Sequence, residues 1–88
     1  MITVTKHAKK ELKRILSDNV DNWYASLRLV SNDQGGLGLG VDIRMPGDRV
    51  VVYEGSKVLL VEPELDSKLK GVTLDIEDTG NGRRLIIC

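Results

Sequence analysis

The stretch from Gly36 to Ile43 alternates strictly between small or polar residues and aliphatic ones. The predicted strand carries Gly36, Gly38, Gly40 and Asp42 on one face, and Leu37, Leu39, Val41 and Ile43 on the other. Glycine inside a strand weakens it and offers nothing to pack, so its repeated use indicates close approach by another group. We expect a neighbouring strand or Trp23 to lie against the glycine face. The spacing G-x-G-x-G, with no helix pattern after it, is not that of a nucleotide-binding loop.

Helical periodicity appears between Lys6 and Ser17, directly after a threonine suited to capping a helix, Thr5. One buried stripe is predicted from Ala8, Leu12, Ile15 and Leu16. The opposite face is basic and holds Lys6, Lys9, Lys10, Lys13 and Arg14. Such a face is a candidate partner surface for nucleic acid or an acidic protein. A simple solvated face is the favoured interpretation, because no aromatic residues are interleaved with the charges.

The remaining pattern predicts further strands and one short helix. Strands are expected at Ile2–Val4, Tyr24–Ser31, Arg49–Tyr53, Ser56–Val61, Val72–Glu77 and Arg83–Ile87, and a helix from Pro63 to a stop at Gly71. Glu54-Gly55 predicts a hairpin between two strands that are apolar on both faces, and we expect both to be central or covered. No β–α–β rhythm calls for a parallel sheet. The fold class is therefore mainly β: a compact, two-layer, mostly antiparallel β-sandwich of about seven short strands with two helices.

Composition narrows the class of protein. With 88 residues, a single domain spanning 1–88 is expected, and the 41% of hydrophobic residues suits a folded globule. Thirteen basic and thirteen acidic residues cancel, so no overall charge attracts nucleic acid or an anionic membrane. The one cysteine, Cys88, excludes an internal disulfide. The N-terminus resembles no signal peptide and no segment could span a bilayer, so we expect a cytoplasmic protein.

Several segments, taken in order, resemble one known family. They are the opening Ile2-Thr-Val-Thr5 with its helix, Gln34-Gly-Gly-Leu-Gly-Leu-Gly40 running on to Pro46, Val50-Val-Val-Tyr-Glu-Gly55, Val58–Pro63, Gly71–Ile76 and Gly80-Asn-Gly82. This order is similar to that of the HesB-like iron–sulfur biogenesis family, the A-type cluster carriers. The resemblance covers nearly the whole chain and implies the HesB-like fold. It also implies that Gly35, Gly36 and Gly40 are backbone positions of the family's glycine-rich loop.

The departures from the family pattern fall on its chemistry. Members of the family hold iron or a cluster through three cysteines, one in the glycine-rich loop and two in a C-terminal C-G-C tail. The first position falls on Gln34 here, and an amide is a poor iron–sulfur ligand beside a thiolate. The tail is expected to be absent, and Cys88 falls short of its cysteines. By this resemblance none of the three ligands transfers, so neither a metal site nor a cofactor is expected.

Three functional hypotheses follow. The leading one is a non-enzymatic HesB-like protein with an adaptor, regulatory or orphan binding role, associating with itself as a homodimer and with iron–sulfur assembly proteins. The second is a genuine carrier that binds iron or a labile cluster between protomers through Cys88 and exogenous thiols. The third is binding of nucleic acid or an acidic protein through the basic helix face, with nucleic acid and membranes disfavoured as partners. An enzyme is the least favoured class, because no catalytic combination of Ser, Cys, His and Asp is evident.

Overall fold

The computed structural model describes residues 2–22, 24–32, 34, 36–80 and 82–87. Seven strands and two helices occur among these residues. Their order is β1 (Thr3–Val4), α1 (Lys6–Asn19), β2 (Ala25–Ser31), β3 (Leu37–Ile43), β4 (Arg49–Tyr53), β5 (Ser56–Val61), α2 (Pro63–Lys68), β6 (Thr73–Thr79) and β7 (Gly82–Ile87). The predicted mainly β fold with two helices is confirmed.

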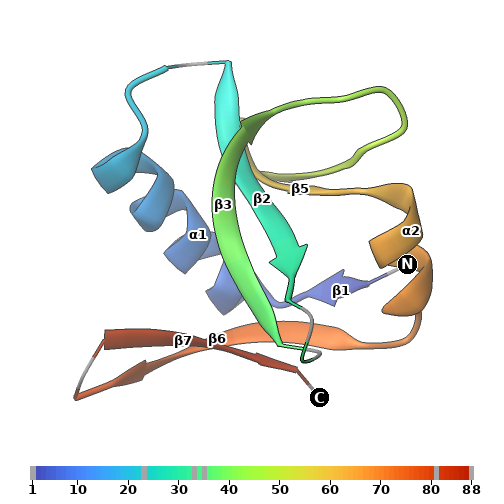
Figure 1. Cartoon of the computed structure of the whole chain (residues 1–88). Helices are drawn as coiled ribbons and strands as arrows, with labels where there is room; N and C mark the ends of the chain where they lie inside the picture. Colours follow the sequence, from blue (N-terminus) through green and yellow to red (C-terminus); the bar gives the residue numbers. More distant parts are fainter. Residues whose placement is uncertain (1, 23, 33, 35, 81, 88) are drawn as a thin grey trace.

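The strands form two sheets, which Figure 1 shows with α1 beside them. One sheet has the order β1-β6-β7 and the other β3-β2-β5-β4. Most neighbouring strands are antiparallel, but β1 pairs with β6 and β2 with β5 in parallel. The β4–β5 hairpin turns as the sequence predicts, with positive φ angles at Glu54 and Gly55. Neither helix in the described part of the chain has the length and apolar character needed to cross a membrane.

Helix α1 packs against strands of both sheets and so joins them into one core. Its buried stripe is as predicted: Ala8 and Leu12 are fully buried, and Ile15 and Leu16 are packed against the core. The Thr5 hydroxyl accepts the Ala8 N–H at 3.0 Å and donates to Asp75 Oδ1 on β6 at 2.7 Å. This contact holds the pKa of Asp75 below its usual value, helped by the Ile76 N–H. The N-cap therefore stabilises α1 and ties it to β6.

The prediction that both strands of the β4–β5 hairpin are central or covered is wrong for one of them. Strand β5 is central, with Val58 and its three apolar successors all fully buried, but β4 is an edge strand and Val52 is 53% exposed. The glycine-rich strand β3 is also an edge strand. A Cβ built on Gly38 would meet only a methyl of Val30, on the neighbouring strand β2, at 3.8 Å, so no described residue presses closely on this glycine. Trp23, the other expected neighbour, lies outside the described residues.

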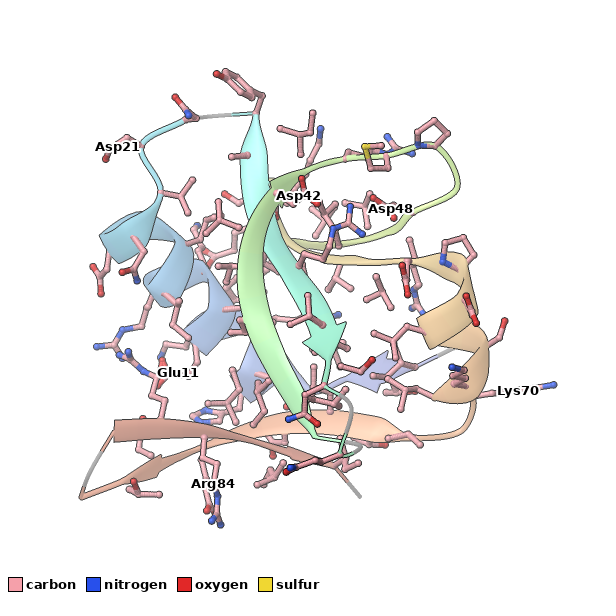
Figure 2. The ribbon with its side chains drawn as sticks, viewed as in Figure 1. Glu11, Asp21, Asp42, Asp48, Lys70 and Arg84 are labelled. Atoms are coloured by element: carbon pink, nitrogen blue, oxygen red, sulfur yellow. The ribbon has the colours of Figure 1, made fainter. Side chains whose placement is uncertain are left out.

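A buried ion pair fixes the chain where β3 ends. Arg28, on β2, donates to Asp48 Oδ1 at 3.0 Å, to Asp42 Oδ2 at 2.9 Å and to the Ile43 carbonyl at 3.2 Å. The Asp48 side chain is only 2% exposed and also accepts the Met45 N–H at 2.7 Å. Figure 2 shows Asp42 on β3 facing the loop that carries Asp48. The pair thus closes the β3–β4 loop against the sheet.

The ion pair also sets the charge of its members. Gly40 is the residue of β3 that lies opposite Arg28 in the β2–β3 register, and the guanidinium reaches past it to Asp42. The Arg28 hydrogen bonds lower the pKa of Asp48 below its usual value of 3.8, and the same contact raises the pKa of Arg28. Asp48 is therefore held as a carboxylate.

Replacing Arg28 with methionine should destabilise the fold by about 3 kcal/mol, because it leaves the buried Asp48 carboxylate without its partner. Since the folded state lowers the pKa of Asp48, the stabilisation is complete above pH about 3.8 and disappears as the pH falls through the lower folded value. Urea unfolding of both proteins, at neutral and at acidic pH, measures the difference. An equal loss in the control Arg44→Met, an exposed arginine in the same loop, would contradict this assignment.

Candidate binding site at the glycine-rich loop

The loop between β2 and β3 is closed by a single asparagine side chain. Asn32 Oδ1 accepts the backbone N–H of Gln34 at 2.9 Å and that of Gly36 at 2.8 Å. The Asn32 N–H in turn donates to the Gly36 carbonyl at 2.9 Å. These bonds form an Asx-type turn, in which the side chain replaces a backbone partner. The backbone of the exposed residue Gln34 is thereby held to the Asn32 side chain.

Only one of the described loop glycines is required by close approach. A Cβ on Gly36 would lie 2.8 Å from Asn32 Nδ2, which is closer than the two atoms can pack. Gly38 and Gly40 would meet only methyl groups of Val30, at 3.8 and 3.9 Å, which is ordinary contact. Gly35 lies outside the described residues. The loop closure by Asn32 therefore depends on Gly36.

The side chains of this loop do not suit an iron–sulfur cluster. Gln34 offers an amide in place of a thiolate, and the Asn32 oxygen is already shared between two backbone donors. Nowhere in the described residues do three His, Cys, Asp or Glu side chains gather as a metal-holding group. His7 is exposed on α1. The candidate thiol, Cys88, lies outside the described residues, so its role stays a prediction.

The second predicted surface, the basic face of α1, is formed from a different element. All five basic residues lie on α1, where Lys6, Lys10 and Arg14 are exposed and Lys9 and Lys13 are partly buried. Lys13 Nζ lies 3.8 Å from Glu54 Oε1, and Arg14 pairs with Glu11 at 3.4 Å. The structure therefore keeps this face together but does not combine it with residues of the glycine-rich loop.

Sequence reasoning missed two polar groups that organise these surfaces. Arg28 could have been noticed as a lone base in an apolar strand, and Glu11 as a lone acid in the apolar stripe of α1. Glu11 is only 3% exposed, and its carboxylate lies 3.6 Å from the Arg83 side chain on β7. Figure 2 shows Glu11 between α1 and β7. The local sequence pattern could not identify Asp48 as the partner of Arg28 or Arg83 as the partner of Glu11, because each partner lies far away in the chain.

Substituting Gly36→Ala should weaken the loop, because the new methyl displaces the Asn32 side chain and frees the N–H groups of Gln34 and Gly36. Gly38→Ala is the matched control and should leave the loop intact, since its Cβ has room. Backbone amide hydrogen exchange reports the outcome: the Gln34 and Gly36 amides should exchange faster in Gly36→Ala only. Equal exchange in the two variants would show that Asn32 does not close the loop.

Comparison with known proteins places the fold. No protein-family model matches the sequence, and no curated protein matches it. Among solved structures, the chain is similar to Escherichia coli SufA, a protein involved in biosynthesis of iron–sulfur clusters, with a TM-score of 0.78 at 17% identity over 99% of this chain and 83% of SufA. It is similar to IscA with a [2Fe–2S] cluster, with a TM-score of 0.65 at 17% identity over 100% of this chain and 84% of IscA.

A third similar structure is an Aquifex aeolicus protein solved by NMR in solution, with a TM-score of 0.70 at 25% identity over 99% of this chain and 89% of that protein. All three superpose over nearly the full length of the chain, so the likeness concerns both sheets and both helices. The order of segments noted in the sequence agrees with this likeness. The chain has the HesB-like fold, the fold of the A-type cluster carriers.

Proposed function

We propose that this protein is a non-enzymatic member of the iron–sulfur assembly machinery that acts as an adaptor, binding assembly proteins without ligating a cluster through its glycine-rich loop. The fold supports the general setting, because SufA and IscA share it over at least 99% of this chain. The observation that carries the proposal is Gln34 on the Asn32-closed loop. There an amide stands where the family pattern has a thiolate, and the backbone N–H of Gln34 is bound by Asn32.

The donor count supports the same conclusion. These 88 residues contain one cysteine, so within them each protomer offers one thiolate and a homodimer offers two. A [2Fe–2S] cluster is ordinarily held by four cysteine thiolates. An amide at Gln34 adds no comparable ligand, because iron–sulfur clusters favour soft sulfur donors. The loop is then best suited to contact another protein through its exposed amide and backbone.

The similarity to IscA with a [2Fe–2S] cluster favours one alternative, a carrier that holds a labile cluster between protomers. In that case Cys88 of each protomer and exogenous thiols would supply the ligands. The two functions differ in a measurable way, because only the carrier requires Cys88 for iron and sulfide to be retained.

Anaerobic reconstitution with ferrous iron and sulfide separates the two functions. We expect the wild type to retain little iron or acid-labile sulfide per protomer, and Gln34→Cys to retain more, but less than one cluster per dimer. Gln34→Ser is the control, because it changes the same exposed position without adding a thiol. Cys88→Ser should change little.

The opposite outcome would be near-stoichiometric iron and sulfide in the wild type that is abolished in Cys88→Ser. That result would replace the adaptor with the carrier. A gain in Gln34→Ser equal to that in Gln34→Cys would also contradict the proposal, because it would show that the amide blocks the loop rather than lacks a thiolate.

A further inference from the structure

Basic charge is concentrated on α1 in a chain that is neutral overall. Helix α1 holds five of the thirteen basic residues and only two of the thirteen acidic ones. One of these two, Glu11, is 3% exposed and pairs with Arg83 of β7 at 3.6 Å and with Arg14 at 3.4 Å, so it offsets the charge of Arg14 but not that of the lysines. The solvent side of α1 is therefore distinctly positive although the molecule is not.

Three of these lysines lack a counter-charge among the residues that the structure describes. Lys6, Lys9 and Lys10 form no ion pair with any other residue that the structure describes. They occupy the first half of α1, where the positive end of the helix dipole disfavours cations, and its first turn contains no acidic residue. No contact among the described residues offsets this unfavourable placement. A negatively charged partner would offset it.

A hollow of about 390 Å³ adjoins this face, between α1 and the β4–β5 hairpin. Lys10, Lys13 and Arg14 line the helix side, and Tyr53 and Glu54 line the hairpin side. The Lys13 ammonium lies 6.0 Å from the centre of the Tyr53 ring and pairs with Glu54. The hollow thus combines an aromatic wall with several cations, which a plain solvated helix face lacks.

We propose that the basic face of α1 and the adjoining Tyr53 hollow dock an acidic segment of a partner protein. Carboxylates of that segment pair with Lys6 and Lys10, and an apolar side chain between them rests on Tyr53. A polypeptide fits better than nucleic acid, because Asp18 and Glu54 at the edge of the hollow repel a continuous phosphate backbone but can be avoided by separate carboxylates. The inference does not depend on the glycine-rich loop or on any cluster.

Fluorescence anisotropy with a fluorescein-labelled glutamate-rich peptide containing one central leucine tests the proposal. The variant Lys6→Glu/Lys10→Glu should bind at least about tenfold more weakly than the wild type. It should be no less stable, because neither lysine pairs with a described acidic residue and position 6, in the first turn of α1, favours an acidic side chain. Binding by the wild type should weaken as salt is raised.

The control is Lys68→Glu/Lys70→Glu, which makes the same charge change on exposed lysines near the end of α2 and also removes the 3.7 Å ion pair of Lys68 with Glu64. Figure 2 shows Lys70 on the far side of the molecule from α1.

Equal weakening of peptide binding in the control, or no binding of the peptide by the wild type, would overturn the proposal. Tighter binding to single-stranded DNA than to the peptide would overturn it in favour of nucleic acid. Self-association lost only in Lys6→Glu/Lys10→Glu would identify a second copy as the occupant instead. Iron content is unaffected by any of these outcomes, so failure here is distinct from failure of the adaptor role.

Discussion

The structure depends first on the burial of one side of α1 between two sheets. Ala8 and Leu12 are fully buried, and the residues around them belong to strands of both sheets. Removing this apolar surface from water contributes on the order of 25 cal/mol per Å². Because one side of α1 must face the core, its basic side must face solvent. The positive face is therefore a consequence of the same packing that joins the sheets.

The second constraint is the position of β3 at the edge of its sheet. Its first residue follows a loop closed by Asn32, and its last leads into a loop closed by Arg28 and Asp48. Gly36 leaves space for the Asn32 side chain at the first of these closures. As an edge strand, β3 pairs with β2 alone among the described strands. Hydrogen bonds to Asn32 and Arg28 hold the chain near its two ends.

Local pattern was sufficient for the elements but not for their arrangement. The cap at Thr5, the start of α2 at Pro63 and the turn at Glu54-Gly55 depend on neighbouring residues, and all were predicted correctly. Strand order depends on distant partners. Parallel pairing joins Arg28 to Leu60, and nothing in either segment alone indicates it. The edge position of β4 was missed for the same reason, because aliphatic residues on both faces also suit an edge strand that other elements partly cover.

The candidate binding surfaces also divide into parts that the local sequence predicts and parts that only the fold brings together. The glycine-rich loop and the basic helix face are continuous in sequence and could be recognised there. Arg28 with Asp48 and Tyr53 with Lys13 come together only in the fold. The central claim is our proposal that this protein of HesB-like fold does not carry a cluster. Iron and acid-labile sulfide per protomer, measured in protein purified without exposure to oxygen, test it most directly. The account predicts far less than one of each per protomer, and near-stoichiometric amounts of both would contradict it.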